Sequence, residues 1–353
     1  GSGPGRKAPC SSPPMVLFAR NLASRLGAWQ EKGQGEAAAN RVKGLALRAC
    51  AAHGWNMTIF STLLRVAAAA MLLVGGNAQA RSDTVATPAL WRVSDADTTI
   101  YLFGTVHVMK PDVVWFDGKV RRAFDASDEL VLEIIEPDDP RALGTTMAGM
   151  ALAKDGVKLS DRLSPPARTA YQAAMEANGL PWQSFELFNP WMPGMALSVA
   201  PLARAGFRTD LGAEKILRAA ATDAGKSLDA LETIEQQIGF FAGLPMDQQI
   251  SFLNATVDGL PDLDKSFDSL LRHWKAGEPE QLAREMNESL EATPELARVL
   301  LTNRNANWAQ WIKARLDRPG TVFVAVGAGH LAGKGSVQEQ LGALDIKVSR
   351  VKD

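Results

Sequence analysis

The order of hydrophobic and polar positions predicts strands in two separate parts of the chain. Residues 89–94 alternate between apolar and polar side chains, and residues 98–103 are rich in β-branched and aromatic ones, so a β-hairpin is expected there. Residues 129–135 and 321–326 are almost wholly apolar, which is typical of strands buried on both faces of a parallel sheet. Residues 346–351 predict an edge strand.

Helical spacing occupies most of the sequence between these strands. Apolar residues recur at helical intervals over residues 116–127, and residues 98–135 have the length of a βαβ unit, so its two strands are expected to be parallel neighbours. Residues 141–318 are mostly helical, with a short strand expected within residues 225–231. The predicted fold is therefore α/β, with a mixed, mostly parallel sheet built from N- and C-terminal βαβ-like units and a large helical insertion between them.

Residues 57–80 have the parts of a secretory signal peptide. Arg65 supplies a positive charge, an apolar run follows at residues 66–74, and Ala78 and Ala80 have the small-x-small spacing of a cleavage site. The run is shorter than the roughly 20 residues that span a bilayer. The alternative interpretation is a buried Ala-rich helix. Signal cleavage predicts a periplasmic or secreted protein without stable membrane insertion.

Residues 1–56 precede this segment and begin with a stretch rich in Gly, Pro and Ser. A segment upstream of a signal peptide is expected to be either non-native sequence or a disordered extension. The remaining residues, 81–353, are long enough for one large domain. They contain no cysteine, because Cys10 and Cys50 both precede them, so packing without disulfides must hold this exported domain together.

The charge balance of residues 81–353 disfavours polyanionic partners. Residues 1–80 hold nine of the 38 Lys and Arg residues and two of the 39 Asp and Glu residues, which leaves 29 basic and 37 acidic residues and a formal charge of −8. Nucleic acid and anionic lipid are therefore not expected as partners. The expected partner is a peptide or small-molecule substrate, and the sequence leaves the oligomeric state open.

Two histidines follow predicted buried strands with the same spacing, in Gly104-Thr-Val-His107 and Gly327-Ala-Gly-His330. The carboxyl ends of parallel strands meet at one edge of a sheet, where ligands bind. We therefore expect His107 and His330 to share a site, although each by itself also fits a hydrogen-bonded loop histidine. His273 is expected at the surface of a helix, and His53 belongs to the N-terminal extension.

Glu133 interrupts a predicted apolar strand. A buried carboxylate costs several kcal/mol unless it is paired or bound to a metal. One interpretation is an ion pair with an arginine such as Arg304 or Arg92. The other is a metal site formed by His107, Glu133 and His330, because two neutral imidazoles and a carboxylate suit a divalent transition metal with open positions. A water bound at such a position ionises near neutral pH and attacks a carbonyl.

Five motifs occur in a fixed order along the chain: Gly104-Thr-Val-His107, Leu130-Val-Leu-Glu133, Asp229-Ala-Leu-Glu232-Thr-Ile-Glu-Gln-Gln237, Arg304-Asn-Ala-Asn-Trp308 and Val326-Gly-Ala-Gly-His330-Leu331. Together they resemble the TraB/GumN family over roughly residues 89 to 352. That family is similar to the Tiki group of metal-dependent proteases, and more distantly to erythromycin-esterase-like and ChaN-like proteins. The resemblance implies an α/β fold in which His107, Glu133 and His330 surround a metal or the scissile bond.

Two further residues match motif positions of the family. Glu232 is a candidate for an additional ligand or for the base that takes a proton from water, and the alternative is a carboxylate at a helix N-terminus. Arg304 is a candidate for binding a developing oxyanion or a substrate carboxylate, and the alternative is an ion pair.

Three functions are compatible with these residues. The leading hypothesis is an exported metal-dependent hydrolase, with a peptidase as the first choice and Mn, Co or Zn as the metal. The second is a metal-free, esterase-like hydrolase in which one histidine is the general base and a carboxylate orients it. The third is a non-enzymatic periplasmic binding or accessory protein, for polysaccharide export or for haem or metal capture.

Overall fold

The computed structural model of the chain describes residues 85–290 and 294–352. The chain divides into two units, Gly1–Arg81 and Ser82–Asp353, and the described residues belong to the second. The predicted extension and signal peptide, both within residues 1–80, therefore lie outside the described residues. Within the described ranges, no helix is both long and apolar enough to cross a membrane.

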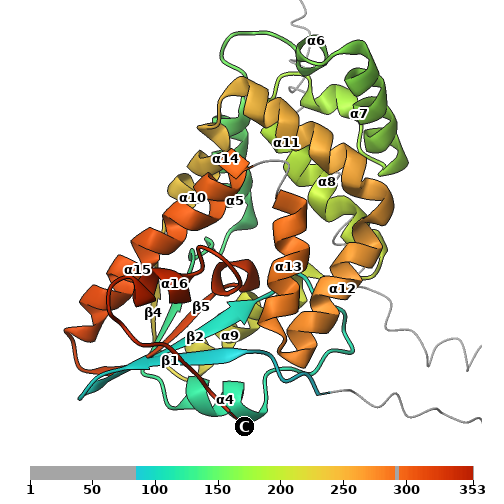
Figure 1. Ribbon diagram of the computed structural model, residues 1–353. Coiled ribbons are helices and arrows are strands. Elements are labelled where there is room, and N and C mark those ends of the chain that lie inside the picture. Colours follow the sequence, from blue (N-terminus) through green and yellow to red (C-terminus); the bar gives the residue numbers. More distant parts are fainter. Residues whose placement is uncertain (1–84, 291–293, 353) are drawn as a thin grey trace, which may run out of the picture. The chain divides into compact units, whose positions relative to one another are not determined.

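Six strands form one mixed sheet, which confirms the predicted α/β fold (Figure 1). In spatial order they are β4 (Ser227–Ala230), β3 (Glu129–Leu132), β5 (Gly320–Gly327), β2 (Thr98–Thr105), β1 (Leu90–Ser94) and β6 (Ser349–Arg350). The first four run parallel, whereas β1 pairs antiparallel with both β2 and β6. β1 and β2 form the predicted hairpin, β4 is the predicted short strand, and β6 is the predicted edge strand.

Two strand predictions were wrong in detail. β2 and β3 are parallel but not neighbours, because β5 lies between them and its Val324 is opposite both Leu102 and Val131. Since β5 is apolar on both faces, it occupies the centre of the sheet. β3 is also shorter than predicted, so Glu133 follows the strand instead of interrupting it. On the β5 side the ladder stops there, because the Gly327 N–H donates to the Glu133 carboxylate and not to a backbone carbonyl.

Helices cover both faces of the sheet. The cluster on one face includes Phe323 and side chains of α4 (Gly118–Asp125), α9 (Ala213–Asp223), α12 (Leu263–Ala276) and α13 (Pro279–Leu290). The other cluster includes Val324 and side chains of α15 (Asn303–Leu316) and α16 (Val337–Gly342). Phe323 and Val324 are consecutive on β5, so alternation along the strand places them on opposite faces. The sheet is therefore the middle of three layers.

The helical insertion predicted between β3 and β5 is present and has cores of its own. Its remaining helices are α5 (Pro140–Ala151), α6 (Leu159–Arg162), α7 (Pro165–Ala177), α8 (Trp191–Arg204), α10 (Ile234–Ala242), α11 (Met246–Gly259) and α14 (Pro294–Ala297). Short 3-10 turns lie at η1 (Trp182–Phe185), η2 (Thr209–Leu211) and η3 (Leu260–Asp262). Tyr171, Met175, Leu197 and Leu253 are fully buried in one of these cores.

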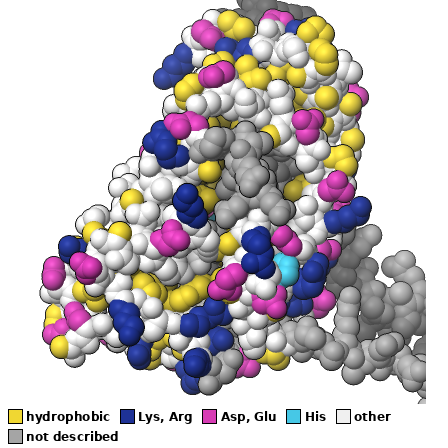
Figure 2. All heavy atoms as spheres, in the orientation of Figure 1, with side chains coloured by type: hydrophobic (Ala, Val, Ile, Leu, Met, Phe, Trp, Pro, Cys, Tyr) yellow, Lys and Arg dark blue, Asp and Glu magenta, His cyan; other side chains and the backbone are white. Residues whose placement is uncertain are grey.

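Charged side chains of both signs are interspersed on the face of the molecule that Figure 2 shows. Several of them form ion pairs, such as Lys110 with Asp268 at 2.7 Å and Lys215 with Glu136 at 2.6 Å. Exposed pairs of this kind contribute little to stability, so the fold depends mainly on the apolar clusters on the two faces of the sheet.

The start of α9 is packed tightly against the segment that follows β2. The Ala213 N–H donates to the Val106 carbonyl at 3.0 Å, and a Cβ on Gly212 would lie 2.4 Å from the His107 carbonyl oxygen. We expect Gly212→Ala to lower the free energy of unfolding by about 1–3 kcal/mol, because the two backbones must separate. Urea unfolding followed by circular dichroism measures this change.

Gly149→Ala in α5 is the matched control, since a Cβ there meets nothing within 4 Å. It should raise the free energy of unfolding by roughly 0.5–1 kcal/mol, because alanine restricts the unfolded chain more than glycine does. A Gly212→Ala protein as stable as the wild type would show that α9 does not press on the His107 segment.

Candidate active site

Four candidate residues follow the carboxyl ends of the four parallel strands. His107 comes two residues after β2, Glu133 directly after β3, Glu232 two residues after β4, and His330 three residues after β5, in the turn η5 (Ala328–Leu331). The fifth candidate, Arg304, reaches this edge from the first turn of α15. The strand directions therefore bring together residues that are far apart in the sequence.

His107, Glu133 and His330 surround Gly327. A Cβ on Gly327 would lie 3.2 Å from Glu133 Oε1, 3.6 Å from His330 Cδ2 and 3.9 Å from His107 Nε2. The missing side chain of Gly327 therefore leaves the space between the two imidazoles and the carboxylate. This is the meeting of residues that the repeated Gly-x-x-His motif predicted.

Glu133 is buried, with 8% of its surface exposed, and it is fully hydrogen-bonded. Its Oε1 accepts from the Gly327 N–H at 2.6 Å, and its Oε2 accepts from Gln237 Nε2 at 2.9 Å and from Arg304 Nη2 at 2.7 Å. Burial raises the pKa of Glu133, but the nearby charges of His330, Arg304 and His107 outweigh burial and lower that pKa to about 2. The carboxylate is therefore ionised at neutral pH.

Arg304 uses all five of its N–H groups in this site. Nε and Nη2 donate to the two oxygens of Glu232, each at 2.8 Å, and Nη2 also donates to Glu133. Nη1 donates to the Leu300 carbonyl at 3.1 Å and faces His330 Nε2, also at 3.1 Å. A guanidinium has five donors and no acceptor, so Arg304 has no N–H left for a substrate in this arrangement.

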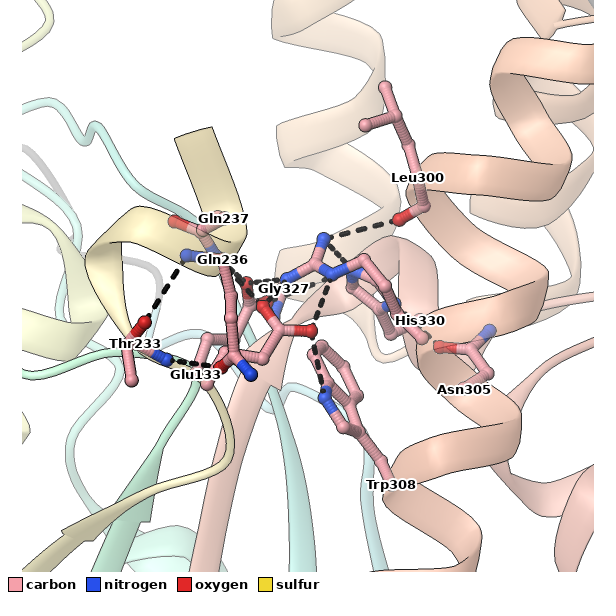
Figure 3. A network of polar contacts seen from close by, with 11 residues as sticks. Glu133, Thr233, Gln236, Gln237, Leu300, Asn305, Trp308, Gly327 and His330 are labelled. Atoms are coloured by element: carbon pink, nitrogen blue, oxygen red, sulfur yellow. Dashed lines mark hydrogen bonds and ion pairs between the residues drawn. The ribbon is translucent and has the colours of Figure 1, made fainter. Parts of the chain in front are cut away.

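Glu232 is held by both Arg304 and Trp308, whose indole N–H donates to Oε1 at 3.0 Å. It also directly precedes Thr233, the N-cap of α10, whose side chain accepts from the Gln236 N–H. Glu232 is therefore a carboxylate at a helix N-terminus and Arg304 is part of an ion pair, which are the alternatives that the sequence offered for these two residues. The two side chains form this buried ion pair with each other. Figure 3 shows this network, with Gln237, Trp308 and His330 among its labelled members.

His330 is buried and its tautomer is fixed by Asn305. The Asn305 amide nitrogen donates to the Gly335 carbonyl at 2.8 Å, so its oxygen, 2.6 Å from His330 Nδ1, must accept the proton that Nδ1 carries. The lone pair of Nε2 consequently faces Arg304. Burial and the charge of Arg304 lower the pKa of His330, and Glu133 raises it in part, so that the pKa is about 4. The imidazole is therefore neutral at neutral pH.

His107 has the opposite environment. Its side chain is 73% exposed, and its Nδ1 lies 2.7 Å from Glu214 Oε1. Glu214 raises the pKa of His107 to about 9, while His107 in turn lowers the pKa of Glu214. Since Nδ1 is paired with a carboxylate, Nε2 is the nitrogen that faces Gly327 and the space beside it.

Glu214 is the site residue that sequence reasoning missed. It lies in the first turn of α9, where an acidic residue is common because it stabilises the helix N-terminus. The available signal was the preceding Gly212, which permits the close approach to the His107 backbone. His273, expected at the surface, is instead largely buried between Glu278 and Glu285, at 2.7 and 3.1 Å from its two ring nitrogens.

The predicted metal set of His107, Glu133 and His330 does not fit a metal while Arg304 holds its present position. Glu133 Oε2 and His330 Nε2, which would be two of the ligand atoms, both face Arg304 N–H groups. A divalent ion about 4 Å from the guanidinium would meet a repulsion on the order of 8 kcal/mol at an effective dielectric constant of 20. Over residues 85–290 and 294–352, no group of three or more His, Cys, Asp or Glu side chains is arranged to hold a metal ion.

Comparison with known proteins relates the chain to one family. Residues 89–350 match the TraB/PrgY/gumN family. The uncharacterized protein YbaP of Escherichia coli (strain K12) is 24% identical over 254 residues, which cover 72% of this chain and 92% of YbaP. An uncharacterized protein of Treponema pallidum (strain Nichols) is 21% identical over 260 residues, which cover 70% of this chain and 78% of that protein. No solved structure matches the chain.

The low pKa of Glu133 makes stability depend on pH in the acid range. Its folded-state pKa of about 2 lies below the ordinary value of 4.5, so the unfolded carboxyl takes up a proton first and stability is lost as pH falls from about 4.5 to 2. Glu133→Gln should show a shallower loss over that window. Urea unfolding at a series of pH values measures the slope.

The control is Glu235→Gln, which changes an exposed carboxylate on α10 in the same way. Its slope between pH 4.5 and 2 should stay close to that of the wild type. Equal slopes for the wild type and Glu133→Gln would contradict an ionised, ion-paired Glu133 in the folded state.

Proposed function

The chain belongs to the TraB/PrgY/gumN family, as its motifs predicted, and we propose that it is an exported hydrolase that adds water to a peptide or ester carbonyl. The observation that supports this reaction is the His107–Glu214 pair. Its Nδ1 lies 2.7 Å from a carboxylate, while Nε2 faces Gly327 and Glu133 at the edge of the sheet. A histidine that is paired with a carboxylate on one nitrogen and belongs to a largely exposed side chain can take up a proton from water.

In the proposed reaction His107 takes up one proton and gives it back. With the ring proton on Nδ1, beside the Glu214 carboxylate, the Nε2 lone pair accepts a proton from water as the water oxygen bonds to the carbonyl carbon. Glu214 and the ionised Glu133 both stabilise the resulting imidazolium. The imidazolium then protonates the leaving amine or alcohol as the bond to the carbonyl carbon breaks, and the site returns to its starting state.

Glu133 and its neighbours position the site in this proposal. The Gly327 N–H, Gln237 and Arg304 hold the Glu133 carboxylate beside Gly327, which Nε2 of His107 also faces. Arg304 acts as a positioning residue, because its donors are taken, and not as the oxyanion ligand that the sequence suggested. The substrate is a peptide or small-molecule ester, and the place of action is the periplasm or the exterior of the cell.

A metal-dependent peptidase is the second candidate function. The meeting of His107, Glu133 and His330 around Gly327 favours it, because these are the ligands that the family resemblance implied for Mn, Co or Zn. It requires Arg304 to leave the positions it occupies between Glu133 and His330. Turnover that is lost after dialysis against EDTA and restored by one of these metals would select it over the metal-free reaction.

His107→Gln tests the proposed base directly. Turnover of 4-nitrophenyl acetate or of BODIPY-labelled casein should fall at least ~100-fold, because general-base catalysis contributes 10²–10⁴-fold. The free energy of unfolding should also fall, because the variant loses the ion pair with Glu214, so circular dichroism is used to check that the variant is folded. His273→Gln is the control, since it removes another histidine that is paired with a glutamate, away from the strand ends, and it should leave turnover unchanged. Full turnover in His107→Gln would exclude the proposed role.

Glu214→Gln tests the orienting carboxylate through the pH profile. In the wild type, turnover should rise with pH until the proton leaves His107, near its pKa of about 9, because only the neutral ring accepts a proton. Without the carboxylate that pKa falls towards 6.5, so the rise should move to lower pH and end at a lower plateau. The pH dependence of kcat/KM between pH 5 and 10 measures both effects. A profile that does not move would contradict the His107–Glu214 pair.

A further inference from the structure

We infer that the Arg304 guanidinium is the built-in cation of this site, and that it occupies the place at which Glu133, Glu232 and His330 would otherwise bind a divalent metal. The three side chains direct a carboxylate oxygen, a second carboxylate and an imidazole lone pair at the same group. Imidazole and carboxylate groups are both ligands of divalent transition metals. Glu232 replaces His107 in this set, which differs from the one predicted from sequence.

The acceptors converge because each follows the end of a different parallel strand. Glu133 follows β3, Glu232 follows β4 and His330 follows β5, and β3 pairs with both of the other strands. Their distances to Arg304 nitrogens are 2.7 Å, 2.8 Å and 3.1 Å. All three therefore point at one small volume, which any cation at this edge of the sheet would have to share.

Arg304 is fixed by more than its ion pairs. Its guanidinium carbon lies 4.7 Å from the centre of the Trp308 ring and 5.4 Å from the centre of the Phe240 ring, and the residue is only 7% exposed. The π-helical turn η4 (Arg298–Thr302), which directly precedes α15, supplies the Leu300 carbonyl that accepts from Nη1. The guanidinium packs against two aromatic rings and each of its N–H groups has an acceptor, so moving it out of the site costs free energy.

One helix provides three of the residues in this arrangement. Arg304, Asn305 and Trp308 are all in α15. Asn305 holds the proton on His330 Nδ1 and so turns the Nε2 lone pair towards Arg304, while Trp308 packs on the His330 ring with centroids 4.3 Å apart and donates to Glu232 (Figure 3). Nε2 of His330 is therefore a hydrogen-bond acceptor, and the Arg304 guanidinium is its donor.

The inference concerns the cation of the site and goes beyond the proposed reaction. It is tested by metal binding without any substrate, so a protein that binds as expected but hydrolyses nothing would contradict the proposed function alone. The protein is first dialysed against EDTA and then titrated with Co²⁺. The visible absorption of Co²⁺ reports its ligand geometry, and metal analysis after gel filtration reports how much stays bound.

Wild type, Arg304→Ala and Arg315→Ala are compared. Arg315 is the matched control because it is also buried, also in α15 and also paired with a carboxylate, that of Glu129, with no histidine in contact. We expect Arg304→Ala to bind one Co²⁺ at least ~100-fold more tightly than the wild type, because a fixed positive charge beside the ion is removed. Arg315→Ala should bind as weakly as the wild type, and Arg304→Ala combined with Glu133→Gln should lose the new site.

Two outcomes would overturn the inference. The first is a wild type that binds one Co²⁺ tightly and loses it in Glu133→Gln, since the metal and Arg304 would then coexist. The second is a folded Arg304→Ala protein that binds no more tightly than the wild type. Circular dichroism decides whether the variant is folded. If it is not, Arg304→Gln takes its place, and the wild-type titration still decides whether the site accepts a metal with Arg304 present.

Discussion

The site depends on keeping one buried guanidinium fully paired. An isolated charge in the interior costs far more than the net stability of a domain allows, so Arg304 is tolerable only because every N–H has an acceptor. That requirement sets the orientation of Glu133, Glu232 and His330. It also links the carboxyl ends of β3, β4 and β5 to α15, so the same contacts that satisfy the charge also join the sheet to the layer of helices above it.

The two Gly-x-x-His motifs have the same local form and opposite chemical environments. His330 is buried against Trp308, receives an N–H from Arg304 and has a lowered pKa. His107 is exposed, is paired with Glu214 and has a raised pKa. Environments that push the pKa values of two like groups apart give them different tasks. One imidazole is therefore a fixed part of the framework, and the other is available for proton transfer.

Much of this architecture was predictable from the sequence, including the parallel strands, the helical insertion and the arrival of His107, Glu133 and His330 at one edge. These features follow from local patterns, because alternation, apolar runs and strand direction need no knowledge of distant contacts. The position of β5 between β2 and β3 was not predictable from the βαβ length, since β5 comes almost 200 residues after β3, and nothing local says which strand it joins. Glu214 was missed for the same reason, because an acid in the first turn of a helix has an ordinary local explanation.

The sequence by itself determined which residues meet at the edge of the sheet, because the end of a strand is a property of the strand. Only the tertiary structure decided which atom each of them faces. Arg304 is 171 residues from Glu133 and 72 from Glu232, and whether such groups form an ion pair or leave room for a metal depends on where α15 lies over the sheet. Hydrogen bonds and ion pairs act over a few ångströms, so their partners are fixed by packing and not by spacing along the chain.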